Sequence, residues 1–117
     1  MASPIFTRAL AIETRNYRLA QDEIESKLKA DKIIERLTLS HIVYNEFMRQ
    51  IKEHPENTSF EVEVLVEPTS NITQKVEAKI LAAAKQKYLP LFPDCKIVSA
   101  HGKDGYFYVC LRINLFE

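Results

Sequence analysis

The spacing of hydrophobic residues changes near Pro55. Before this proline, apolar side chains recur at intervals of about three to four residues, which is typical of amphipathic helices. After it, apolar and polar side chains mostly alternate, which is typical of strands with one buried face. The pattern therefore predicts helices in the first half of the chain and a sheet in the second.

The N-terminal segment fits two conformations. Ser3-Pro4 suits a helix cap followed by proline at the first helical position. However, Phe6, Leu10 and Ile12 also suit an alternating strand, so residues 4–14 stay open, with helix favoured.

Residues 17–54 form a predicted helical pair. The first helix carries an apolar stripe of Leu19, Ile24, Leu28, Ile34 and Leu37. Thr38-Leu39-Ser40 interrupts it, and either hydroxyl could cap the second helix. That helix presents Ile42, Val43, Phe47 and Ile51 on one side. Pro55 ends it, because proline has no amide hydrogen to donate.

Residues 58–117 predict a β-α-β-β unit. In the first strand, alternation places Phe60, Val62, Val64 and Val66 toward the core. Asn71 and Gln74 resemble a capping box and predict a helix over residues 71–87. Residues 96–100 form a short strand, and Asp104-Gly105 is a strong hairpin signal. The strand over 106–116 has five apolar residues on one face: Phe107, Val109, Leu111, Ile113 and Leu115.

These elements predict an α+β fold: an N-terminal helical pair followed by a β-α-β-β unit with a three-stranded, mainly antiparallel sheet. The last strand should be central, with at least one helix packed on the sheet. We expect one domain over 1–117, in which 1–16 is an N-terminal arm or helix start. A compact domain of this length has a radius of gyration of about 13 Å.

Composition excludes several classes of protein. Sixteen basic and sixteen acidic residues cancel, so the chain lacks the positive field of a typical nucleic-acid or anionic-membrane binder. The two glycines, Gly102 and Gly105, cannot form a glycine-rich phosphate loop. No apolar run is long enough for a membrane span. With Arg8 and Glu13 near the start and two cysteines in all, we expect no secretory signal, a reducing compartment and a cytoplasmic protein.

Three groups of residues are candidates for reactive or metal-binding sites. His101, Lys103, Asp104 and Tyr106 could form a hydrolase or nuclease site at the hairpin, which is a weak alternative. Cys95, Cys110 and His101 could bind zinc, but a two-residue turn at Asp104-Gly105 separates the thiols by about 13 Å. Glu61, Glu63 and Glu67 alternate on one strand and fit a solvent-facing edge. We therefore expect no catalytic residue, metal or cofactor.

The second face of the sheet is the main candidate surface. One helix covers only one face, so the N-terminal helices or another subunit must cover the other. We expect a small non-enzymatic assembly, regulatory or protein-interaction module that forms homo-oligomers, with an interface of Leu65, Tyr106, Tyr108, Arg112 and Phe116. The alternative is a single-stranded nucleic-acid binder using Tyr106, Tyr108 and Arg112, opposed by the charge of Glu61 and Glu63. No membrane partner is expected.

Overall fold

A computed structural model describes residues 4–116 of the chain. Its elements are α1 (Arg8–Ile34), α2 (Ser40–Glu53), β1 (Ser59–Pro68), the short 3-10 turn η1 (Thr69–Asn71), α3 (Gln74–Tyr88), β2 (Lys96–His101) and β3 (Tyr106–Asn114). The three strands form one antiparallel sheet in the order β1-β3-β2, with β3 in the centre. The α+β class and the central last strand are therefore confirmed. Within residues 4–116, no helix has both the length and the hydrophobicity that crossing a membrane requires.

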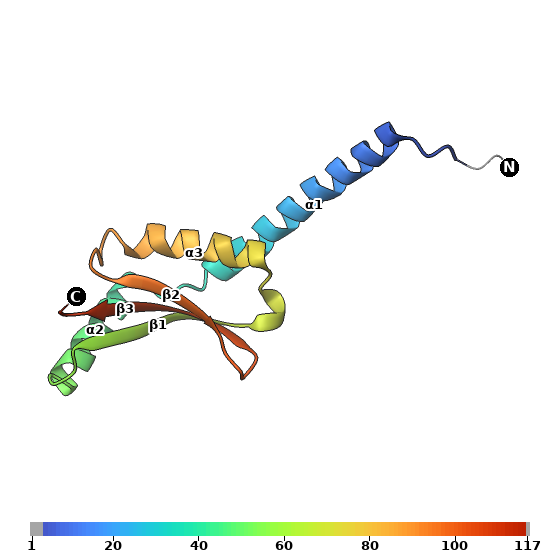
Figure 1. Cartoon of the computed structure of the whole chain (residues 1–117). Coiled ribbons are helices and arrows are strands. Elements are labelled where there is room, and N and C mark those ends of the chain that lie inside the picture. The colour runs from blue at the N-terminus through green and yellow to red at the C-terminus, as the bar shows by residue number, and fades with distance from the viewer. Residues whose placement is uncertain (1–3, 117) are drawn as a thin grey trace.

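α1 is one continuous helix of 27 residues. It begins after Thr7, whose side chain accepts a hydrogen bond from the Leu10 amide at 3.1 Å. The residues left open between helix and strand are thus helical from Arg8 onward. Figure 1 shows that only the last turns of α1 reach the rest of the fold, while its N-terminal part projects away from it.

The projecting helix makes the molecule elongated, with extents of 78 × 30 × 25 Å. Its radius of gyration is 20.4 Å instead of the expected value near 13 Å. The predicted apolar stripe of the first helix is buried only at its end: Leu37 lies in the core and Ile34 packs against it, whereas Leu19, Ile24 and Leu28 are exposed. The residues of α1 that enter the core are Ala30 and Ile33, on the turns beside α3.

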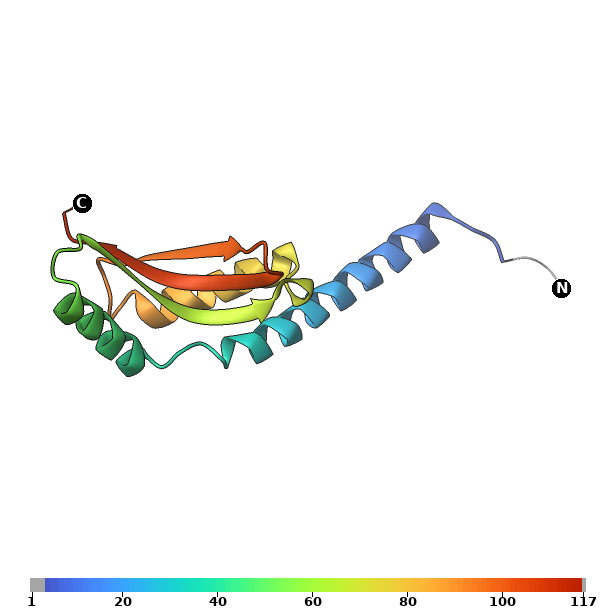
Figure 2. The ribbon, with the colours of Figure 1, turned by 90° about the horizontal axis from the view of Figure 1, so that it is seen from below.

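α3 covers one face of the sheet, which we call the inner face; α2 and the last turns of α1 lie along the β1 side (Figure 2). The core between these layers centres on fully buried side chains: Val43, Val76, Ile80, Tyr88, Phe107, Val109 and Leu111. α3 begins at Gln74 instead of the predicted Asn71, and its N-cap is Thr73, whose hydroxyl accepts a hydrogen bond from the Val76 amide. Asn71 instead ends η1.

The connection between α1 and α2 is joined to β1. The Thr38 amide and hydroxyl both donate to the Val64 carbonyl, each at 3.0 Å. The Tyr88 hydroxyl donates to the Thr38 carbonyl at 2.6 Å. Thr38 therefore fastens the linker to the sheet, and α2 begins after Leu39 without a side-chain cap.

A β-bulge in β1 overturns part of the predicted alternation. The pairing with β3 shifts between Glu63, opposite Cys110, and Leu65, opposite Val109. Val64 is the extra residue, so every later side chain of β1 changes face. Leu65 is buried, whereas Val66 is 41% exposed.

Candidate interaction surface

The face of the sheet opposite α3, which we call the outer face, is not covered by any helix of residues 4–116 (Figure 2). Strand register defines its three rows. Glu61, Arg112 and Lys96 form the first row; Glu63, Cys110 and Val98 form the second; Val66, Tyr108 and Ala100 form the third. Tyr106 follows on β3, opposite Pro68. The N-terminal helices, which the sequence left as one candidate cover of this face, instead lie beside β1 and α3.

The central part of the outer face is apolar, and its end is charged. Val66 and Tyr106 are 41% and 45% exposed, and Tyr108 is half-buried between them and β2. In the charged row, Arg112 donates to Glu61 from Nε at 2.9 Å and from Nη2 at 2.7 Å. The arginine is thus already paired within the protein.

Asp104 orients the two tyrosines. It accepts a hydrogen bond from the Tyr108 hydroxyl, and it accepts another from the Tyr106 amide at 3.2 Å. The bond to Asp104 raises the pKa of Tyr108 to about 12, and the same bond lowers the pKa of Asp104. Both tyrosines are therefore held at the hairpin end of the outer face, and Tyr108 stays neutral at physiological pH.

The predicted interface residues do not all lie together. Tyr106, Tyr108 and Arg112 share the outer face. Leu65 does not, because the bulge turns it into the core, where it is 5% exposed. Phe116 is 81% exposed but lies beyond the end of β3. Leu115, which was predicted to continue the core face of β3, is also exposed.

The sheet separates His101 from Asp104, two residues of the predicted hydrolase or nuclease site at the hairpin. His101 pairs with Phe107 and points to the inner side, where its Nε2 lies 3.0 Å from Glu77 of α3. Asp104 instead bonds Tyr108 on the outer side. The geometry therefore does not bring the imidazole and this carboxylate to one point, as the hydrolase or nuclease alternative requires.

The hairpin also differs in register from the prediction. Gly102 and Tyr106 close a three-residue loop, in which Gly105 has a φ of 86°. Glycine adopts this left-handed conformation without steric cost, and a type I turn followed by such a residue is a common hairpin loop. Cys110 consequently faces Val98, whereas the predicted two-residue turn would place it opposite Ser99.

The buried positions of the two cysteines indicate a structural role. Cys95 belongs to the core, and Cys110 lies on the outer face between Glu63 and Val98. Burial, and secondarily the Glu61 carboxylate, raises the pKa of Cys110 to about 12, and burial raises that of Cys95. Within residues 4–116, no three His, Cys, Asp or Glu side chains are arranged to hold a metal ion.

The three glutamates of β1 also separate. Glu61 and Glu63 lie on the outer face, but the bulge turns Glu67 inward, where it is 4% exposed. Glu67 forms an ion pair with Arg36, which follows α1. The predicted solvent-facing row is therefore correct for two glutamates and wrong for Glu67.

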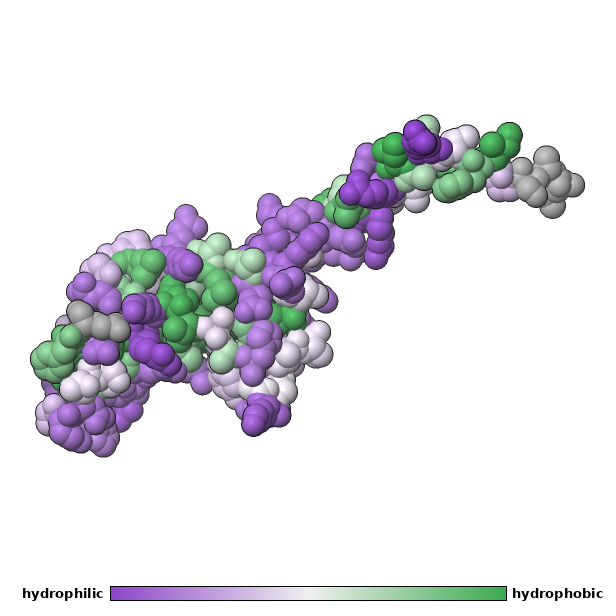
Figure 3. Space-filling model, viewed as in Figure 1, coloured by the Kyte–Doolittle hydropathy of each residue, from purple (hydrophilic) through white to green (hydrophobic). Residues whose placement is uncertain are grey.

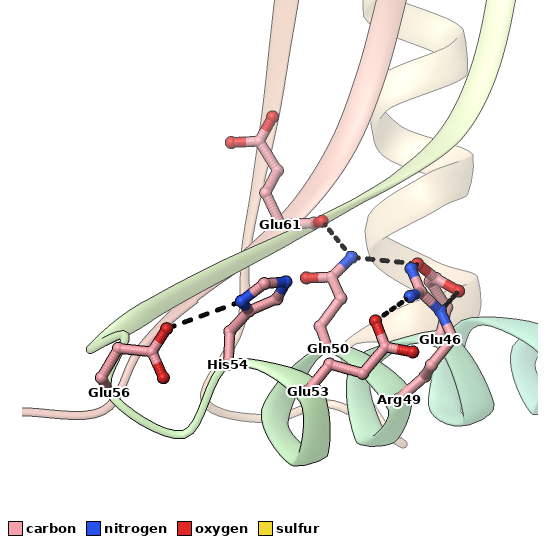
Figure 4. Close-up of polar contacts among 7 residues, drawn as sticks. All are labelled: Glu46, Arg49, Gln50, Glu53, His54, Glu56 and Glu61. Carbon is pink, nitrogen blue, oxygen red and sulfur yellow. Dashed lines mark hydrogen bonds and ion pairs between the residues drawn. The ribbon is translucent and has the colours of Figure 1, made fainter.

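A polar network fixes α2 beside β1 (Figure 4). Gln50 donates to the Glu61 carbonyl at 3.0 Å and to Glu46 at 3.2 Å. Arg49 contacts both Glu46 and Glu53, and its hydrogen bonds lower the pKa of Glu46 to about 2. Because these side chains satisfy one another, we assign the network a structural role.

A second exposed apolar surface was missed from sequence: the projecting part of α1. Hydrophobic and hydrophilic residues alternate over it, and several hydrophobic ones reach the solvent (Figure 3). Leu10, Tyr17, Ile24 and Leu28 are 44%, 67%, 54% and 59% exposed. Their signal in the sequence is a seven-residue repeat, Leu10-Tyr17-Ile24, which fits a helical partner rather than a globular core.

Comparison with protein-family models, with curated proteins and with solved structures finds no match to the chain. The two exposed surfaces are therefore the features of the molecule that point to a function.

Proposed function

We propose that the protein is a non-enzymatic assembly module that binds proteins, foremost other copies of itself, through the outer face of its sheet. The observation that carries this proposal is the one-sided packing of the fold. All the helices lie on the inner face or beside β1, so Val66, Tyr106 and Tyr108 remain accessible on the other side.

The chemistry of the outer face supports a protein partner. Interface centres are enriched in tyrosine and arginine and are surrounded by polar residues that exclude water. Here the tyrosines lie beside Val66 and Val98, and the charged row flanks them at one end. Asp104 holds Tyr108 in place, which reduces the entropy lost when a partner binds.

Nucleic-acid binding through the same face has weaker support. The Arg112 guanidinium, which would contact a phosphate, is paired with Glu61, and Glu63 lies beside it on β1. These carboxylates repel phosphate. A fluorescence-anisotropy titration with single-stranded DNA and RNA should give dissociation constants no tighter than about 10⁻⁵ M at physiological salt. Sub-micromolar, salt-sensitive binding would favour this alternative.

Light scattering coupled to size-exclusion chromatography tests the assembly proposal. We expect the wild type to exceed the monomer mass of 13.5 kDa and Tyr106→Glu to reduce the observed mass. Tyr44→Glu is the matched control, because Tyr44 is an exposed tyrosine on α2, away from the outer face. If Tyr106→Glu and Tyr44→Glu both leave the mass unchanged, the outer face does not mediate assembly.

A further inference from the structure

We infer that the projecting part of α1 pairs with α1 of a second copy in an antiparallel two-helix contact. This inference deepens the proposed function, since it assigns a separate surface and a defined partner to self-association. It depends on α1 alone and not on the outer face.

Four exposed apolar residues of α1 form one narrow stripe, whereas Ile12 and Leu19 are exposed on the opposite side of the helix. At about 100° per residue, Leu10, Tyr17, Ile24 and Leu28 lie within about 40° of one another around the helix axis. Ala30 and Ile33, which pack toward α3, lie on the opposite side. Glu23 is also on that side, where it pairs with Lys79 of α3 at 2.7 Å. The stripe, which we call the distal stripe, therefore faces away from the rest of its own chain.

The distal stripe is symmetric in position. Thr14 and Gln21 complete it, so that its members alternate at four- and three-residue intervals from 10 to 28, as in a coiled-coil seam. These positions are symmetric about residue 19. An antiparallel partner would place Leu10 against Leu28, Thr14 against Ile24, and Tyr17 against Gln21. Each polar position of the stripe then meets a large side chain from the second copy, and the contact is a two-fold interface.

Charge selects the antiparallel arrangement. Residues 8–20 contain three arginines and one glutamate, whereas residues 21–31 contain four acidic residues and two lysines. The first half of the helix is therefore net positive, and the second half is net negative. Antiparallel pairing brings opposite halves together and sets Glu13 near Lys27 of the second copy; parallel pairing brings like halves together.

The exposed area fits a missing partner. The chain exposes 8597 Å², about 2,000 Å² more than the roughly 6,500 Å² expected for a compact monomer of this mass. A stable interface buries about 800 Å² on each partner, so the excess is sufficient for one. The pairing is also unobstructed, because each α3 lies behind its own helix and away from the contact.

Disulfide cross-linking tests both the contact and its direction. In the double variant Thr14→Cys/Ile24→Cys, the introduced thiols of two chains meet, and mild oxidation with a glutathione redox buffer should give a covalent dimer. The two sites within one chain are about 15 Å apart along the helix, too far for an internal disulfide. Thr14→Cys alone should give no dimer. Cys95 and Cys110 do not compete, because both are buried.

The outcomes are distinct. A dimer from Thr14→Cys alone would show parallel pairing and overturn the proposal, and so would the absence of a dimer from the double variant. When Tyr106→Glu is added to the double variant, the cross-link should still form, because it depends on α1 and not on the outer face. Failure of the outer-face proposal therefore leaves this result unchanged.

Light scattering gives an independent measurement without new cysteines. In the Tyr106→Glu background, the remaining dimer of twice the chain mass should fall to 13.5 kDa when Ile24→Glu is added. Leu19→Glu is the matched control, because Leu19 is 44% exposed on the opposite side of α1 and should leave the dimer intact. Ile24 is exposed, so its variant should still fold and unfold in one cooperative urea transition. Its far-UV helicity should fall only by the part that residues 8–20 lose when they no longer pair. Equal masses for the two variants would contradict the proposed stripe.

Discussion

The β1 bulge turns Glu67 into the protein, and the ion pair with Arg36 compensates its buried charge. Removing this ion pair is the sharpest test of that arrangement. The Glu67 side chain is 5% exposed, whereas that of Arg36 is 61% exposed. Removing the guanidinium by Arg36→Ala leaves a carboxylate among core residues opposite Phe107. Breaking a fully buried pair costs about 3–5 kcal/mol. Because Arg36 is largely solvated, we expect a smaller loss, about 1.5–3 kcal/mol of unfolding free energy.

A double-mutant cycle separates this effect from lost packing. Glu67→Gln keeps the shape and removes the charge, and it should cost about 1 kcal/mol. The combined variant Arg36→Ala/Glu67→Gln should be more stable than the sum of the single losses predicts, by at least about 1 kcal/mol. Urea unfolding followed by circular dichroism measures all four proteins at one pH, and equal slopes are required. Additive losses would refute the reasoning and would indicate that Lys29 or Lys32, which line the same hollow, take over as partners of Glu67.

Three further outcomes are expected. Leu111→Ala removes a fully buried side chain and should cost about 2–5 kcal/mol in urea unfolding, whereas Asn114→Ala should cost under about 1 kcal/mol; equal losses would mean that both faces of β3 are buried. Because the raised pKa values keep Cys95 and Cys110 protonated at pH 7.5, both thiols should react with Ellman's reagent only when the protein unfolds, and a fast native reaction at either would contradict their burial. Burial raises the pKa of Tyr88 from 10.0 to about 12, so its contribution to stability is complete below pH 10 and is lost as the pH rises toward 12. Tyr88→Phe should therefore lose less stability than the wild type as the pH rises above 10. Identical pH profiles for the two proteins would show that ionisation of Tyr88 does not cause the alkaline loss of stability.

The spacing of apolar and polar residues was sufficient to predict the order of helices and strands, because each of these elements depends mainly on residues close together in the sequence. The alternation in β1 was interpretable only up to Glu63. Val64 is apolar like its neighbours, so no residue type marks it as the extra one. Its position is set by pairing with β3 and by the two hydrogen bonds from Thr38 to the Val64 carbonyl. These are long-range contacts that a sequence window does not contain, and they explain why Leu65 and Glu67 were assigned to the wrong face.

The candidate surface was partly predictable for the same reason. Tyr106, Tyr108 and Arg112 follow the regular period of β3, but the sequence left open whether the N-terminal helices or another subunit cover their face of the sheet. The distal stripe of α1 was harder to recognise. Leu19, Ile24 and Leu28 were grouped as one stripe, although Leu19 lies on the other side of the helix. Only the position of α3 shows that Ala30 and Ile33 define the buried side.

The projecting part of α1 has a thermodynamic consequence of its own. A helical segment in water is marginal below about 12–15 residues when no tertiary contact supports it, since nucleation is costly. Residues 8–20 extend from the supported turns and have no buried side chain among them. Their helix–coil equilibrium is therefore linked to association by mass action. Far-UV helicity and amide protection in this segment should rise with protein concentration, while those of α3 stay constant, so that dimerisation and completion of the helix are one coupled transition.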